Sequence, residues 1–258
     1  MLWNASELNG HAIQATDGNL GFVSDILFDD ASWTLRWLVV DTGNWLPGRQ
    51  VLLPVSALGQ PDRNLRILPI NLTKQQVKDS PEIDTDKSVS RQHEAHIFDF
   101  YGLDPYWGGG LYPLSNAMAV PFLAPLPPAE HKPEDAAVAT ISADEEDQHL
   151  RSVAAVTGYH MHATDGQIGH AADFLVDVDT WAIRYIKVDT QNWWPGLLVL
   201  IAPNLVRKID WAERLIDINA DRQKVKGSPP YHAEMTVDGA YDEKFMTYYT
   251  YSGSFGGV

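Results

Sequence analysis

Apolar and polar residues alternate with a period of two in several short segments of the chain. The clearest are 35–41 (LRWLVVD) and 183–189 (IRYIKVD), in which β-branched and aromatic residues dominate. Short strands separated by turn residues at intervals of about ten positions are typical of a small antiparallel barrel or sandwich. We therefore expect a mainly β protein. Further predicted strands cover 51–54, 65–70, 198–202 and 214–218.

An Asp-Gly pair lies between predicted strands at two places, with the aspartates at Asp17 and Asp165. Asp-Gly predicts a type I′ hairpin turn, in which both central residues take positive φ. We therefore interpret these two carboxylates as turn residues rather than catalytic groups.

One short helix is predicted after the last strand of each set. Thr73 and Asp221 are suitable N-cap residues, and a proline follows each segment, at Pro81 and Pro229.

The whole pattern occurs twice. A shift of 148 residues aligns 10–81 with 158–229 without a gap, and 29 of the 72 aligned positions are identical. A repeat of about 100 residues has the size of an independent domain and is too long for a solenoid unit. We predict domains at 1–102 and 150–258, joined by residues 103–149, with the fused copies forming a covalent analogue of a homodimer.

The connecting segment has a different composition. Residues 101–125 are rich in aromatic residues, glycine and proline, and residues 125–150 contain seven carboxylates and one lysine, which predicts a flexible acidic linker. Aromatic segments also follow both copies at matching offsets and are too apolar to remain in water. We expect them to pack on a barrel or in a seam between barrels related by a pseudo-two-fold axis. Their large residues are Phe98, Phe100, Tyr101, Phe245, Tyr248 and Tyr249.

Charge and composition exclude several classes of protein. The chain has 34 Asp and Glu against 19 Lys and Arg, a net charge of −15, and a pI near 4.8. This acidity opposes binding to nucleic acid or anionic lipid. There is no cysteine, so thiol catalysis and thiolate metal sites are excluded. Because no signal peptide and no apolar run of about 20 residues is present, we expect a cytoplasmic protein that contacts membranes only through a partner.

The segment TDGNLGFVSDILFDDASWTLRWLVVDTGNWLPGRQVLLP, residues 16–54, resembles the PRC-barrel family, named for the photosynthetic reaction centre H subunit and shared with the ribosome-maturation factor RimM. Residues 164–202 resemble it less closely, departing at Gln191, Leu197 and Ala202. The resemblance implies two tandem compact β-barrels that serve mainly in assembly and docking.

Carboxylates that occur in both copies are the first candidates for chemistry. No histidine or serine accompanies them in both copies to complete a nucleophilic site, so we expect structural roles in turns and ion pairs, such as Asp25 with Arg36, and no enzyme activity. The pairs are Asp25 with Asp173, Asp29 with Asp177, and Asp41 with Asp189.

Three histidines, His160, His162 and His170, are the candidates for a metal site. His160 and His162 share a strand face, but the predicted turn register places His170 opposite Met161, on the other face, so that a site would require a bulge. We therefore expect neither a metal nor a cofactor. His93 and His96, in a predicted amphipathic helix, favour a metal no more strongly.

The loops NWLPG and NWWPG are the candidate partner-binding surface, because tryptophan beside Pro-Gly either caps a barrel end or anchors a partner. The residues are Trp45, Pro47, Trp193, Trp194 and Pro195.

We expect a non-enzymatic interaction or assembly module, docking to a membrane-associated photosynthetic or electron-transport complex, with packed barrels and a possible homo-oligomer. The alternatives are a small-ligand or metal-binding protein with an inter-barrel pocket, and a RimM-like ribosome-biogenesis factor. The acidic charge and the missing N-terminal barrel domain of RimM disfavour the last.

Overall fold

The computed structural model describes residues 1–43, 45–47, 49–81, 91–107, 149–190, 197–232 and 235–251. The chain divides into two compact units. The larger unit, residues 1–87 with 149–258, contains both copies of the repeat. The smaller unit, residues 88–148, contains helix α3 (Arg91–Tyr101), on which the Phe98 ring meets the ring of Trp107 edge-on. Phe98, Phe100 and Tyr101, the large aromatic residues of the first aromatic segment, all lie on α3.

The first copy forms a sheet of strand order β5-β4-β3-β2-β6. Strand β2 pairs with β6 in parallel, and the other neighbours on this path are antiparallel. The elements are β2 (Ala12–Ala15), β3 (Gly18–Asp29), β4 (Thr34–Asp41), β5 (Gln50–Pro54), the 3-10 turn η1 (Val55–Ala57), β6 (Ile67–Pro69) and α2 (Lys74–Lys78).

The second copy repeats this arrangement in the order β11-β10-β9-β8-β13-β12, with β8 and β13 parallel. The elements are β8 (His160–Ala163), β9 (Gly166–Asp177), β10 (Ile183–Asp189), β11 (Leu198–Ile201), the 3-10 turn η2 (Pro203–Leu205), β12 (Val206–Asp210), β13 (Leu215–Ile218), α5 (Arg222–Lys226) and α6 (Gly239–Tyr251).

The two copies exchange their first strands. Strand β1 (Leu2–Asn4) pairs antiparallel with β9 of the second copy, and β7 (Leu150–Ser152) pairs antiparallel with β3 of the first. Each exchanged strand leads into one helical turn, α1 (Ala5–Leu8) or α4 (Val153–Val156). Each sheet therefore contains a strand from the other copy, and the two copies form one unit rather than two separate barrels.

The expected mainly β architecture is confirmed, but the expectation of wholly antiparallel sheets is wrong. After β5 the chain passes through η1, and the next strand, β6, pairs in parallel with β2. After β11 it passes through η2 and the edge strand β12, and the following strand, β13, pairs in parallel with β8. Among the described residues the pairings form an open path, yet its two ends are neighbours in the chain. Six flat strands would separate the edges by about 24 Å, more than the link from Ile201 to Val206 spans, so the sheet is rolled.

The two predicted short helices are confirmed. Thr73 forms a capping box with Gln76 at the start of α2, and Asp221 accepts a hydrogen bond from the Lys224 backbone N–H at the start of α5. Asp17 and Asp165 also cap these helices, because each accepts the first backbone N–H, at 2.7 and 2.8 Å.

The hairpin turns differ from the type I′ prediction. The turn residues between β2 and β3 are Thr16 and Asp17, and neither has positive φ, whereas Gly18 opens the strand at φ 144°. The carboxylate of Asp17 is drawn to the helix N-terminus instead. The register of the hairpin is also irregular, with a shift between Ile13 and Gln14.

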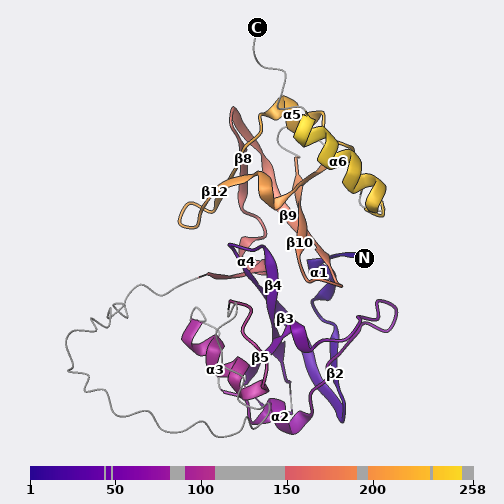
Figure 1. Cartoon of the computed structure of the whole chain (residues 1–258), viewed down its shortest axis with the longest axis vertical. Coiled ribbons are helices and arrows are strands. Elements are labelled where there is room, and N and C mark those ends of the chain that lie inside the picture. Colours follow the sequence, from indigo (N-terminus) through magenta and orange to yellow (C-terminus); the bar gives the residue numbers. More distant parts are fainter. Residues whose placement is uncertain are drawn as a thin grey trace, which may run out of the picture. The chain divides into compact units, whose positions relative to one another are not determined.

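Helix α6 covers the second sheet and was not predicted as a helix. In Figure 1, α6 lies beside strands β9 and β10. Its Tyr241 and Phe245 are buried against Leu175, Tyr185 and Leu200, and Tyr249 is packed against this cluster. The expectation that the second aromatic segment is packed rather than left in water is confirmed for these residues, which lie against the second sheet. Tyr248 instead donates a hydrogen bond to the Lys224 carbonyl, at 2.7 Å, and so joins α6 to α5.

Candidate functional site

The seam between the two copies is made of backbone and aromatic contacts. The Leu35 N–H donates to the Trp181 carbonyl and the Ile183 N–H donates to the Trp33 carbonyl, both at 2.8 Å. Both tryptophans have left-handed backbone conformations, with φ 53° and 60°. This rare conformation turns each carbonyl toward the other copy, and its recurrence in both copies indicates that the seam stabilises it.

Each exchanged strand and the helical turn after it, β1 with α1 or β7 with α4, form an exchanged arm. One aspartate holds each arm in place, the buried Asp173 or the half-buried Asp25. Asp173 accepts hydrogen bonds from the backbone N–H and the hydroxyl of Ser6, at 3.1 and 2.5 Å. Asp25 accepts from the Ser152 hydroxyl at 2.5 Å and from the Ala154 N–H at 3.4 Å. Each carboxylate therefore caps the helical turn of the opposite copy.

The other repeated carboxylates lie in turns, as expected. Asp29 accepts from the backbone N–H groups of Ala31 and Ser32, and Asp41 accepts from the Gly43 N–H. The suggested Asp25–Arg36 ion pair is wrong: Asp25 is engaged by the exchanged arm, and the Arg36 guanidinium donates to the Ser32 hydroxyl.

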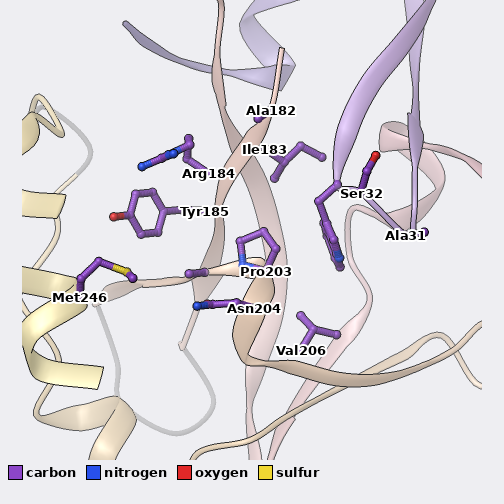
Figure 2. Close-up of a pocket in the computed structure, with 12 residues that line it drawn as sticks. Ala31, Ser32, Ala182, Ile183, Arg184, Tyr185, Pro203, Asn204, Val206 and Met246 are labelled. Atoms are coloured by element: carbon purple, nitrogen blue, oxygen red, sulfur yellow. The ribbon is translucent and has the colours of Figure 1, made fainter. Parts of the chain in front are cut away.

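A groove of about 580 Å³ opens along the seam (Figure 2). The turn residues Ala31 to Trp33 line it from the first copy, and strand β10, the η2 region and α6 line it from the second. In Figure 2, Met246 and Tyr185 face Ser32 and Ala31 across the opening. Met246 is 49% exposed, so an apolar side chain stands free at the rim.

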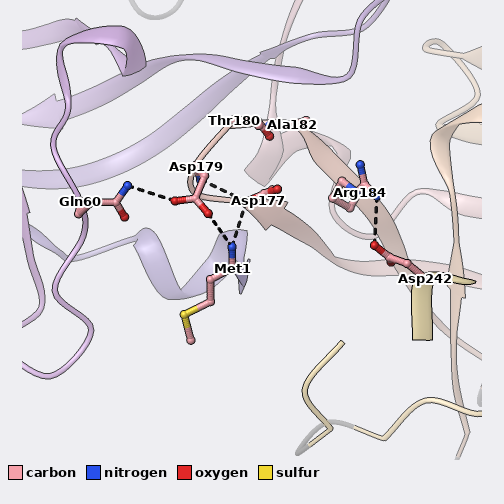
Figure 3. Close-up of polar contacts among 8 residues, drawn as sticks. All are labelled: Met1, Gln60, Asp177, Asp179, Thr180, Ala182, Arg184 and Asp242. Atoms are coloured by element: carbon pink, nitrogen blue, oxygen red, sulfur yellow. Dashed lines mark hydrogen bonds and ion pairs between the residues drawn. The ribbon is translucent and has the colours of Figure 1, made fainter. Parts of the chain in front are cut away.

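Polar groups at one wall of the groove are mutually fixed. Asp242 of α6 accepts a hydrogen bond from the Tyr185 hydroxyl at 2.5 Å. The same carboxylate pairs with the Arg184 guanidinium at 3.1 Å, as Figure 3 shows. Burial raises the pKa of Tyr185, and the hydrogen bond with Asp242 raises that pKa further. Tyr185 therefore keeps its proton at neutral pH and remains a hydrogen-bond donor.

The corresponding position on the other side of the seam is filled differently. Ala31 of the first copy matches Asp179 of the second in the 148-residue shift. The Asp179 carboxylate accepts from the Met1 amine at 2.9 Å and from the Gln60 amide at 3.1 Å (Figure 3). These bonds lower the pKa of Asp179 and raise that of the Met1 amine. At the matching position of the first copy, Ala31 lines the groove and carries no polar side chain.

Of the predicted partner-binding residues, Trp45 and Pro47 lie in the described part of the chain. Trp45 is half-buried, with the Lys74 ammonium 4.8 Å from its ring centroid, and Pro47 is exposed. The Thr42 hydroxyl contacts the carbonyls of Leu46 and Arg49 and so shapes the loop. Trp193, Trp194 and Pro195 lie outside the described residues, and the role of these loops stays a prediction.

The predicted register of the three histidines is wrong. His160 is paired directly with His170, because the register shifts between Met161 and His162. Even so, among the residues that the structure describes, no three His, Asp or Glu side chains gather closely enough to hold a metal ion. His160 instead contacts the Gln167 amide at 3.3 Å. His96 is exposed on α3, and the side chain of His93 lies outside the described part.

The chain is similar to one known protein family over part of its length. Residues 4–78 match the family model of the PRC-barrel domain. The match covers the first copy from the end of β1 to the end of α2, and the second copy forms a sheet of the same strand order. Among proteins with curated descriptions, none matches the chain. No helix in the described ranges is long and apolar enough to cross a membrane.

The sequence suggested an inter-barrel pocket only as an alternative and identified none of the residues that line this groove, although a signal was present. The PRC-barrel match and the repeat identify positions that build the fold, whereas the groove depends on positions at which the copies differ. Ala31 against Asp179 is such a position, and Tyr185 against Trp37 is another. Comparison of the unequal positions would have directed attention to this side of the seam.

Proposed function

We propose that this protein is a non-enzymatic interaction and assembly module whose two PRC-barrel-like halves act as one platform, and that the seam groove receives a protein partner. The observation that carries the proposal is the asymmetry of the seam. The same position bears Asp179 with its polar partners on one side and Ala31 beside an open groove of mixed apolar and polar lining on the other.

The composition of the groove suits a partner side chain of apolar character. Trp33 and Ile183 supply apolar area, and Met246 is an adaptable residue of the kind enriched at protein interfaces. Arg184 and Asn204 provide a polar edge. Because the chain carries a net charge of −15, a partner with a basic surface around its apolar anchor is favoured.

The resemblance to PRC-barrel proteins directs the choice of partner. By that analogy the client is a membrane-associated complex of photosynthesis or electron transport, to which this chain docks from the cytoplasmic side. A fixed relative orientation of the two halves supports this role, because a platform that needs no ordering on binding loses less free energy.

A photo-crosslinking residue at position 246 of the full chain tests the proposal in detergent-solubilised membranes of the source cell. We expect one specific protein adduct at position 246 and none at position 235, since Met235 is also exposed, at 41%, but lies outside the groove. The substitution Ala31→Asp, which copies the second half at an exposed site, should lower partner capture at least about tenfold. Equal adducts at both positions would contradict the docking role.

A small ligand in the same groove is the second candidate. The volume of about 580 Å³ lies within the range of roughly 300–1,000 Å³ common for ligand pockets. Native mass spectrometry of the chain purified from its source would show a bound small molecule, and Ala31→Asp would remove it. A metal is not proposed, because the described residues offer no ligand set.

A further inference from the structure

A second cavity lies away from the seam groove, at the base of the first exchanged arm. It has a volume of about 300 Å³ and is lined by Glu7, His11, Arg63 and Arg66. Glu7 belongs to α1, His11 precedes β2, and the two arginines lie in the loop between β5 and β6. Cationic or hydrogen-bonding side chains, those of His11, Arg63 and Arg66, thus line one cavity that is open to solvent.

His11 is the central observation. Its side chain is 2% exposed, and neither ring nitrogen has a hydrogen-bond partner among the described residues. Burial lowers the pKa of His11, and the positive charge of Arg66 lowers it further, while the carbonyls of Glu7 and Leu8 act in the opposite direction. The imidazole is therefore neutral at pH 7, and its one N–H donor and one acceptor form no well-aligned hydrogen bond, although the Glu7 and Leu8 carbonyls lie near the ring. A buried polar ring without partners is costly unless something in the cavity satisfies it.

The charges around the cavity leave a local excess of positive charge. Glu7 is engaged on both oxygens, by the Asn4 amide at 2.7 Å and by the Arg63 guanidinium at 2.9 Å. Arg63 also lies over the Trp3 ring, 4.6 Å from its centroid, which holds the guanidinium in place. Arg66 donates to the Asn9 carbonyl at 3.2 Å. A carbonyl is neutral, so this contact does not neutralise the guanidinium charge.

The duplication supplies an internal comparison. The positions of Glu7, His11 and Arg63 are occupied in the second copy by Ala155, Tyr159 and Trp211. Only the last arginine is shared: Arg66 and Arg214 both have φ 53°.

In the second copy aromatic side chains occupy the positions that line the cavity in the first copy, and arginines contact their rings. The Arg214 guanidinium lies 5.6 Å from the Tyr159 ring centroid, and the Arg151 guanidinium lies 4.0 Å from that of Trp211. The same backbone frame therefore carries a stacked cluster in one copy and a polar cavity in the other.

We propose that this cavity is a binding site for a small oxyanion, a phosphate or a short carboxylate, held by Arg63, Arg66 and the N–H of His11. Arginine forks match the oxygen pairs of both anion types, and hydrogen bonds between charged groups are stronger than those between neutral groups. The volume admits an anion of a few heavy atoms with accompanying water. Because Glu7 and Trp3 belong to the exchanged arm, an anion bound here also joins that arm to the first sheet.

The site is tested on the full chain by following the imidazole signal of His11 by NMR during titration with inorganic phosphate and, separately, with acetate, at constant ionic strength. We expect a saturable shift. A tighter response to phosphate assigns the site to phosphate groups, and a tighter response to acetate assigns it to carboxylates; either outcome supports the proposal. The signal is identified by its loss in His11→Tyr, which installs the residue found at Tyr159.

Matched arginine variants separate specific binding from a general salt effect. Arg66→Gln should weaken anion binding at least about tenfold, because a charge-assisted bidentate contact is lost. Arg214→Gln changes an arginine of the same backbone conformation in the other copy and should leave the affinity unchanged. The absence of a saturable shift, as for a cavity that holds only water, or equal affinities of Arg66→Gln and wild type, would overturn the proposal.

Discussion

Thr34 and Ala182 occupy the same position in the two copies, and they pair with each other in an antiparallel bridge. Equivalent residues meet in this way only at a two-fold axis, so the pseudo-dyad of the duplication passes between them. Phe28 and Phe174 approach each other across the seam, with ring centroids 6.1 Å apart. The fused chain therefore keeps the isologous interface of a homodimer inside a single molecule.

Cleavage between the copies should leave them associated. A protease site inserted at residue 135, in the predicted acidic linker, would yield two fragments that still share the β1–β9 and β7–β3 pairings. We expect the cleaved chain to elute at the size of the intact 28.7 kDa protein and to separate only in denaturant. Separate elution of the fragments in native buffer would show that the exchanged strands contribute little.

Substitution of Gly21 or Gly169 by alanine should be strongly destabilising. A Cβ at these positions would lie 2.0 or 1.9 Å from the carbonyl oxygen of Asp41 or Asp189, and φ is 139° or 137°. We expect each change to lower the free energy of unfolding by at least about 3 kcal/mol in urea titrations. Gly239→Ala is the control: it meets no atom within 4 Å and should change stability by about 0.5 kcal/mol or less.

The Ser6–Asp173 contact should show measurable coupling between the copies. Ser6→Ala and Asp173→Asn each remove part of the inter-copy helix cap, and we expect a cost of about 1–3 kcal/mol for each. In a double-mutant cycle the coupling energy should be near 1 kcal/mol. Asp79→Asn, whose carboxylate accepts from Gln75 within the first copy, should combine additively with Asp173→Asn. Additivity in the Ser6 cycle as well would refute the cap.

Stability should fall at alkaline pH because Tyr185 and Tyr241 are buried between α6 and the second sheet. Burial raises the pKa of Tyr185 above its usual value of 10.0, and burial raises that of Tyr241 to about 12. An acid whose pKa is higher in the folded state contributes stability that is complete below pH 10 and is lost as the pH rises further. Urea unfolding between pH 8 and 12 should show this decline, with a shallower slope for Tyr185→Phe. An equal slope for both proteins would argue against it.

The extent of sequence-based prediction differed between local and long-range features. The caps at Thr73 and Asp221 were predictable because the signal lies within one turn of the helix that it starts. The pairing of β1 with β9 was not, since three residues such as Leu2–Asn4 carry no periodicity that selects a partner strand. Likewise, the His160–His170 pairing depended on one register shift, which moves every later residue to the other face.

The strand exchange also sets the order in which the chain can reach its native form during synthesis. Leu2 pairs with Asp177, so the residues made first must wait for a strand that leaves the ribosome 175 residues later. At about 5–20 residues per second this delay is about 9–35 s. During this delay β1, with Trp3 at its centre, has no β9 to pair with. Strand β3 of the first copy likewise keeps an exposed edge until β7 of the second copy has been made.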